Sequence, residues 1–138
     1  MTIARTVLNA FADRLGPAGF STDRDRIEPL LTEWRGLYRG ESAALLLPST
    51  VAEVQDIVRL ATRYRVPLVP QGGNTSMVGG ATPTPDGTAI LLSLRRMDRI
   101  RRIDPGQAVA EAGVIPTAVE AVVPTYLYRY RKGGQYAE

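Results

Sequence analysis

Two short apolar segments flank a helical pattern between residues 44 and 70, and this arrangement constrains the fold of the 138-residue chain more than any other feature. Residues 44–47 stop at a proline and residues 66–70 contain two, so both segments suit short buried strands. Thr50 and Glu53 between them have the spacing of a capping box. Apolar residues then recur every three or four positions, and we expect the helix to bury Val51, Val54, Ile57, Val58, Ala61 and Tyr64. The pattern predicts two parallel strands joined by a right-handed helical crossover.

The rest of the chain predicts further helices and short strands. A helical pattern over residues 3–15 ends at a Gly-Pro-Ala-Gly sequence, and residues 27–34 predict a short second helix, with Trp34 and nearby Tyr38 expected in the core. Three more strands are predicted at residues 88–94, 100–103 and 108–112, the last two as a hairpin, and a helix follows at 117–122. The predicted fold class is therefore α+β: a β-α-β unit followed by a small mixed sheet with flanking helices.

A glycine-rich segment directly follows the second strand. Of the nine residues 72–80, four are glycine, and polar Asn74, Thr75 and Ser76 stand between two Gly-Gly pairs. Glycines let a backbone approach a ligand closely, and successive amides in such a loop form an anion-binding concavity. The segment lacks the lysine of a nucleoside-triphosphate loop, and its spacing does not match G-x-G-x-x-G. A ligand-free turn stays open, but polar donors set between glycine pairs favour a diphosphate site.

Composition excludes several other functions. The chain has neither cysteine nor histidine, so it offers no disulfide, thiolate nucleophile or imidazole, and we assign it no catalytic residue and no metal site. Its net charge of +3 and two short arginine-rich runs do not make a nucleic-acid footprint. No apolar run reaches the roughly 20 residues of a membrane span, and no signal peptide is recognised, so we expect a cytoplasmic protein.

Residues 48–54 and 66–80 together resemble the FAD-linked oxidase family, which has the vanillyl-alcohol oxidase or PCMH-type flavin fold. The resemblance extends over residues 27–121, through Glu33-Trp34-Arg35-Gly36, residues 90–97 and residues 110–114, and favours the branch of D-2-hydroxyglutarate, D-lactate and glycolate dehydrogenases. Ser76 departs from it, because many relatives have glycine there.

This resemblance implies FAD as the cofactor and a flavin that takes a hydride equivalent from a D-2-hydroxy acid. It also implies which residues line the FAD pyrophosphate: Pro70, Gln71, Gly72, Gly73, Asn74, Thr75, Ser76, Gly79 and Gly80.

The resemblance divides the chain into three parts. Residues 1–42 form an N-terminal helical segment, residues 43–122 the first, partial portion of a PCMH-type FAD-binding domain, and residues 123–138 an atypical tail. Members of the family bring a second glycine-rich segment and a cap domain. We therefore expect a truncated chain that binds FAD weakly or not at all and is inactive alone. Four of the six tyrosines and the only lysine lie between positions 126 and 136, which a frameshift near Val122 or a divergent tail would explain.

Two other functions remain open. The chain could be a flavin-free interaction or dimerisation module, in which an alternating tyrosine face in the tail pairs two copies. It could also be one subunit of a split flavoenzyme whose C-terminal half is a separate chain. The substrate is not predicted, because the resemblance places the residues that select it outside this sequence.

Overall fold

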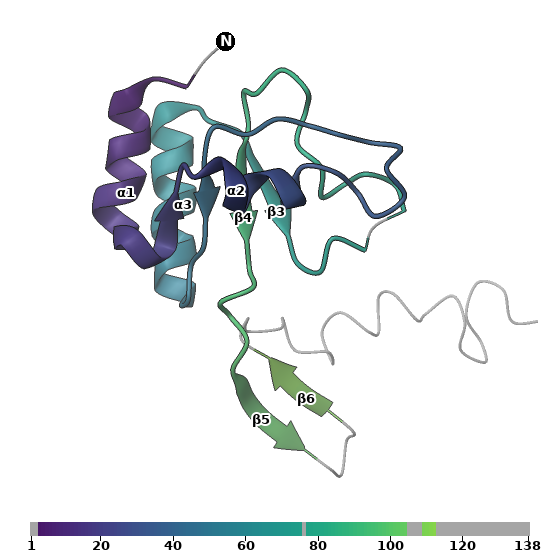
Figure 1. The fold of residues 1–138 in the computed structure, drawn as a ribbon. Coiled ribbons are helices and arrows are strands. Elements are labelled where there is room, and N and C mark those ends of the chain that lie inside the picture. Colours follow the sequence, from purple (N-terminus) through teal and green to yellow (C-terminus); the bar gives the residue numbers. More distant parts are fainter. Residues whose placement is uncertain (1–2, 76, 105–108, 113–138) are drawn as a thin grey trace, which may run out of the picture. The chain divides into compact units, whose positions relative to one another are not determined.

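The computed structural model describes residues 3–75, 77–104 and 109–112, and the chain divides into two compact units, residues 1–98 and 99–138 (Figure 1). The described elements of the first unit are α1 (Arg5–Gly19), β1 (Phe20–Ser21), α2 (Arg24–Ile27), the 3-10 helix η1 (Glu28–Leu30), β2 (Leu45–Leu46), α3 (Val51–Tyr64), β3 (Leu68–Gln71) and β4 (Ile90–Ser93). None of the helices in the described ranges is both long enough and apolar enough to span a membrane.

The first unit is built on a mixed four-stranded sheet in the order β1-β2-β4-β3. Strands β2 and β3 each pair in parallel with β4, and β1 pairs antiparallel with β2. The two strands of the predicted β-α-β unit therefore run in the same direction, as the sequence predicts, but β4 lies between them. The α+β class is confirmed, and the glycine-rich loop follows β3, an edge strand of the sheet.

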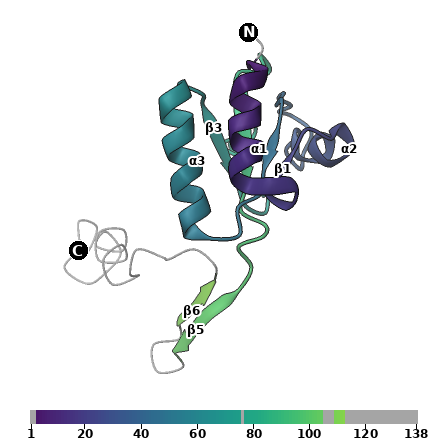
Figure 2. The same ribbon diagram turned by 90° about the vertical axis from the view of Figure 1, so that its left-hand side faces the viewer.

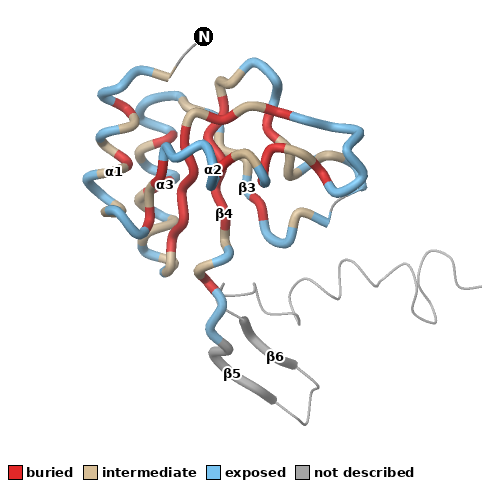
Figure 3. Tube along the Cα trace, in the orientation of Figure 1, coloured by how far each residue is buried: buried red, intermediate tan, exposed pale blue. Residues whose placement is uncertain are grey.

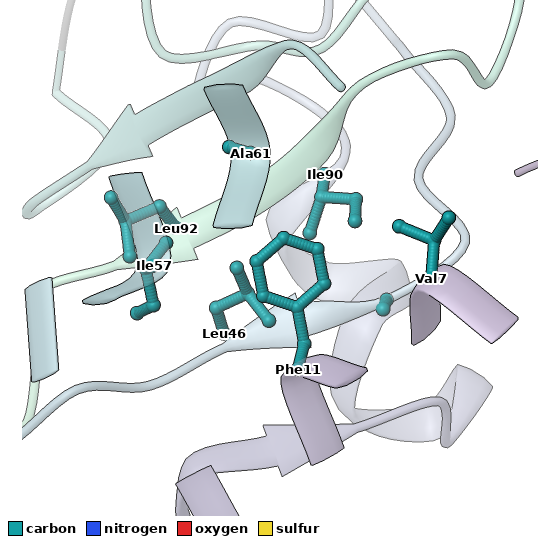
Figure 4. Close-up of a cluster of buried hydrophobic side chains, with 8 residues drawn as sticks. Val7, Phe11, Leu46, Ile57, Ala61, Ile90 and Leu92 are labelled. Carbon is teal, nitrogen blue, oxygen red and sulfur yellow. The ribbon is translucent and has the colours of Figure 1, made fainter. Parts of the chain in front are cut away.

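The strands of the sheet are largely buried (Figure 3), and apolar side chains form a core cluster on each of its faces. Along β4 they alternate: Ile90 and Leu92 join one cluster, whereas Leu91 joins another. Helices α1 and α3 lie side by side over the first face, where Val7, Phe11 and Ile57 pack against strand residues (Figures 2 and 4). Residues from α2, η1 and the following turn cover the second face. The sheet is thus buried on both sides, which fixes where its strand ends lie.

Helix α3 begins with the cap that the sequence predicts, except that the Glu53 carboxylate bonds the amide of a different residue. Thr50 Oγ1 accepts a hydrogen bond from the Glu53 amide at 3.2 Å, while Glu53 Oε2 accepts from the Ser49 amide rather than from that of Thr50. The Ser49 amide and hydroxyl also hold the pKa of Glu53 below its usual 4.5. The prediction was wrong for Val58 and Tyr64, which are exposed because α3 buries a narrower stripe, centred on Ile57 and Ala61.

Replacing Thr50 with alanine is expected to lower the free energy of unfolding by about 1 kcal/mol, because the Glu53 amide loses its capping acceptor. Urea denaturation followed by circular dichroism measures the change. Thr62→Ala in the same helix is the matched control, since Thr62 Oγ1 only donates to the carbonyl of Val58 one turn earlier. Equal destabilisation by the two variants would contradict the assigned cap.

The N-terminal segment differs from its prediction in two places. Gly16 interrupts α1 with a φ of 65°, which confirms the predicted break although the helical assignment runs on to Gly19. The helix expected over residues 27–34 is wrong: α2 and η1 end by Leu30 and the chain then forms a turn. Trp34 and Tyr38, expected in the core, are 61% and 50% exposed on that turn. The apolar spacing that predicted the helix over residues 27–34 does not show where the chain turns.

The second unit contains the predicted hairpin, made of β5 (Ile100–Asp104) and β6 (Val109–Ala112). The strands pair antiparallel, with a register irregularity between Ile100 and Arg102. The hairpin turn at 105–108, the helix expected at 117–122 and the 123–138 tail lie outside the described residues.

Candidate functional site

The candidate site is the loop that leaves the C-terminal end of β3. Its first residue, Gln71, is the last residue of the strand and is buried, and its carbonyl accepts from the Leu94 amide at 3.0 Å. The residues that follow, up to Gly80, lie mostly at the surface. A rigid sheet edge therefore presents an exposed loop, the usual arrangement for a binding segment.

The glycines of this loop fall into two groups. Gly79 has a φ of +70°, and a Cβ there would come within 3.2 Å of the Tyr38 ring, so the fold itself requires glycine. A Cβ on Gly72 or Gly80 would meet nothing within 4 Å, and one on Gly73 would meet only a Thr75 methyl at 3.7 Å. None of these three has a left-handed φ. Packing within the chain does not explain them, whereas a closely approaching ligand would.

Backbone donors gather at the same place. Within the part of the chain that the structure describes, the N–H groups of Gly72, Gly73, Asn74 and Thr75 make no hydrogen bond. Four successive amides at an exposed, glycine-rich turn form a donor surface that suits a bound anion.

Buried polar atoms without partners also cluster around the loop. Among the described residues these atoms are Gln71 Oε1, Asn74 Oδ1, Thr82 Oγ1 and Ser93 Oγ. Ser93 is the direct partner of Gln71 in the β3–β4 register, so the group lies at the ends of the two strands and in the loop. Because buried polar groups normally find partners, ordered water included, these atoms are places where a water molecule or a ligand group can bind.

The segment from Leu30 to Gly40 supports the loop from the inside. The Gln71 side-chain amide donates to the Leu30 and Ala81 carbonyls, each at 3.0 Å, and the Asn74 amide donates to the Thr32 carbonyl at 2.9 Å. Asn74 has a positive φ of 56°, which asparagine tolerates better than most residues. Two side chains of the predicted site therefore face the protein and hold the loop.

Arg35 and Tyr38 extend this support. Arg35 Nη2 donates to the Met77 carbonyl, and the Tyr38 ring lies against Gly79. Glu33, 2% exposed, accepts hydrogen bonds from the amides of Arg35 at 3.0 Å and Leu37 at 2.8 Å. Burial raises the pKa of Glu33, but those amides and the Arg35 guanidinium lower it, and the net pKa lies below 4.5. Glu33 is therefore charged at neutral pH.

An apolar surface patch borders the loop. It combines the turn with the loop, and its members are Trp34, Leu37, Tyr38, Met77 and Val78, between 50% and 85% exposed. The Arg35 guanidinium lies 5.9 Å from the centre of the Trp34 ring. Most of the large exposed apolar side chains of the described chain belong to this patch. Exposed apolar residues that were merely scattered over the surface would not be grouped in this way.

The structure places the predicted site residues in distinct surroundings. Pro70, Gly72, Gly73, Thr75 and Gly80 are exposed, whereas Gln71 and Asn74 turn inward and Gly79 packs on Tyr38. Ser76 lies outside the described residues. Sequence reasoning gave no role to Glu33 and Arg35, although their segment belonged to the family resemblance. The available signal was the Glu33-Trp34-Arg35-Gly36 segment, which shares in that resemblance.

The chemistry offered by the loop is that of binding. It supplies amides, hydroxyls and amide side chains, and no acid or base lies between Pro70 and Gly80. In the described part of the chain no cluster of metal-ligating side chains exists either. A charged hollow between α1 and α3 is lined by Arg14, Asp56 and Arg59, whose charges pair with one another. The loop is therefore the stronger candidate.

Comparisons with known proteins agree with this geometry. Residues 42–132 match the family described as FAD binding domain. A probable mitochondrial D-2-hydroxyglutarate dehydrogenase of Oryza sativa subsp. indica is 40% identical over 119 residues, covering 81% of this chain and 21% of the relative. The Bos taurus D-2-hydroxyglutarate dehydrogenase is 36% identical over 116 residues, covering 83% and 21%. The chain thus spans about a fifth of the length of these curated relatives.

Solved structures share the fold. An alkyldihydroxyacetonephosphate synthase superimposes with a TM-score of 0.68 at 19% identity, covering 91% of this chain and 25% of that one. A substrate-bound p-cresol methylhydroxylase gives a TM-score of 0.62 at 20% identity, covering 96% and 27%.

Proposed function

Because this chain belongs to the FAD-binding domain family, whose cofactor is FAD, we propose that residues 70–80 hold the pyrophosphate of that cofactor. The main support is that the amides from Gly72 to Thr75 have no hydrogen-bond partner within the described chain. In addition, a Cβ added at Gly72 or Gly80 would contact no atom within 4 Å. A diphosphate is a compact anion that needs several donors on an uncluttered surface. Of the buried polar atoms without partners, only the Thr82 and Ser93 hydroxyls can donate to an anion, because Gln71 Oε1 and Asn74 Oδ1 are acceptors.

Some residues of the loop would contact the phosphates, and others hold the loop in its conformation. Gly72, Gly73 and Gly80 give the phosphates room, the amides of residues 72–75 donate to them, and the Thr75 hydroxyl adds a donor. Gln71, Asn74 and Gly79 keep the loop in shape through their contacts with residues 30–38. Binding here orients the cofactor and leaves proton transfer to groups outside the loop.

We further propose that the domain serves a flavin-dependent oxidation of a D-2-hydroxy acid. Relatives named D-2-hydroxyglutarate dehydrogenase, from a plant and a mammal, support this substrate class. Bound FAD supplies the acceptor of the hydride equivalent. The described residues of the loop include no acid or base. We therefore assign substrate binding and proton removal to residues outside the loop.

The expected result of titrating the purified chain with FAD is weak but saturable quenching of flavin fluorescence, because the chain spans only about a fifth of the length of its relatives. Trp34, the only tryptophan, lies on the patch beside the loop and gives a second, independent signal. ADP should compete with FAD because it carries the same diphosphate, whereas riboflavin, which has no phosphate, should not.

Absence of saturable binding up to about millimolar FAD would overturn the proposed site, since affinities weaker than this amount to only about 4 kcal/mol. Competition by riboflavin but not by ADP would place the contact on the ring system instead of the loop. Concentration-dependent self-association without flavin binding would favour the interaction-module alternative.

A further inference from the structure

The turn at residues 33–38 is built around one buried carboxylate. The Glu33 side chain is 1% exposed and accepts from two amides of its own turn and from Arg35 Nε, the last at 3.3 Å. The Glu33 amide in turn donates to the Tyr38 carbonyl at 3.0 Å, which closes the turn. A buried charge is tolerated only when its partners satisfy it, and here all of these partners lie within six residues. The turn is therefore a rigid unit.

This rigid turn contacts the glycine-rich loop through side chains of both segments. Arg35 Nε donates to Glu33 Oε2, and Nη2 of the same guanidinium donates to the Met77 carbonyl. The Tyr38 ring packs on Gly79, and the residue just before the turn, Thr32, receives the Asn74 amide. The contacts fall at residue 74, within the run of donor amides at 72–75, and at residues 77 and 79 just after it.

A guanidinium suits this bridging position better than an ammonium. Its donors are fixed in one plane, so the bond to Glu33 also sets the direction of the bond to the Met77 carbonyl. Fixing that carbonyl fixes the plane of its peptide, because a trans peptide is rigid. The loop is thereby ordered before any ligand arrives, which removes part of the entropy lost on binding.

We propose that Glu33 and Arg35 are positioning residues for the cofactor, which hold the 71–80 loop in its binding conformation without touching the ligand. The inference rests on the proposed function of that loop. Freeing one residue's backbone corresponds to about a tenfold change in an equilibrium constant. Removing the Arg35 bridge is therefore expected to weaken FAD binding about tenfold.

The test compares Arg35→Gln, Arg35→Lys and the wild-type full chain. A positioning role predicts that both variants lose about tenfold in FAD affinity. Lysine keeps the positive charge but lacks the planar set of donors that bonds Glu33 and the Met77 carbonyl at the same time. It also predicts that the ratio between variant and wild type changes little with salt. Arg39→Gln is the matched control: its side chain pairs with Glu28 and Glu41 rather than the loop, and FAD affinity should stay unchanged.

Recovery of affinity in Arg35→Lys, with a steep salt dependence in the wild type, would assign Arg35 to direct phosphate contact and overturn the proposal. Unchanged affinity in both variants would overturn it as well. Glu33→Gln tests the other partner and should reproduce the Arg35→Gln loss if it folds.

Hydrogen exchange of the ligand-free chain separates this inference from the proposed function. Arg35→Gln should speed exchange in the peptide covering residues 71–82, where the Thr82 amide bonds the Gly79 carbonyl, and leave α3 unchanged. Unchanged exchange in residues 71–82 would remove the positioning role. If the wild type binds no FAD, the proposed function is wrong, and Glu33 and Arg35 then have no role in cofactor binding. Faster exchange would then still show that Arg35 orders the loop.

Discussion

Replacing Gly72 with valine is expected to weaken FAD binding by roughly a hundredfold while the protein stays folded. A Cβ at Gly72 meets no atom within 4 Å and its φ is not left-handed, so the new side chain strains nothing in the chain itself. It would, however, fill open space next to the amides that we propose bind the phosphates. Two lost hydrogen bonds to a charged ligand, at about 1.5 kcal/mol or more each, correspond to a factor of this size.

Flavin fluorescence titration measures the affinity of Gly72→Val, and thermal unfolding measured by circular dichroism establishes that the fold is retained. Ala52→Val is the control for valine at an exposed position away from the loop, on α3, and should leave FAD affinity unchanged. Gly72→Ala should fall between wild type and Gly72→Val, because a methyl group fills less of the space. Wild-type affinity in Gly72→Val would move the phosphate site elsewhere.

Replacing Phe11 with alanine is expected to remove about 3–5 kcal/mol of stability, the range for deleting a buried phenyl group. The ring is fully buried and packs among Leu46, Ile57 and Ile90 (Figure 4). Domains of this kind are stable by only about 5–15 kcal/mol in total, so the variant should unfold at far lower urea concentration. The midpoint of urea denaturation, with the slope held common, gives the difference.

Phe20→Ala is the matched comparison, since Phe20 is the other phenylalanine and is only partly buried beside the same cluster. It should cost clearly less than Phe11→Ala. Phe11→Leu should also cost less, because leucine keeps most of the apolar contact. A loss below about 1 kcal/mol for Phe11→Ala would mean that α1 does not pack on the sheet as described.

The local features of the fold could be predicted because neighbouring residues determine them. The Thr50 cap, the break at Gly16 and the short strands before and after α3 each depend on a few adjacent side chains. The loop was located for the same reason, since its glycines and polar residues are consecutive. Its predicted ligand contacts, from Pro70 to Gly80, remain predictions.

The support of the loop could not be predicted, because it joins residues about 40 positions apart. The bonds from Arg35 to the Met77 carbonyl and from Asn74 to the Thr32 carbonyl span 42 residues each, and no periodicity reports such pairs. Trp34 and Tyr38 were misplaced because apolar character alone does not distinguish a core position from an exposed one. The insertion of β4 between β2 and β3 likewise depends on pairing across the sheet.

The position of β4 also sets when the sheet can form during synthesis. This strand is the last of the four to leave the ribosome, yet β2 and β3 each pair with it and not with each other. Until residues 90–93 emerge, the nascent chain carries two short apolar strands that lack their shared neighbour, together with helices whose apolar faces have no complete sheet to cover. Such exposed surface is what holdase chaperones bind. Strands β1 and β2 can pair with each other earlier, but the four-stranded sheet is complete only when β4 joins β2 to β3.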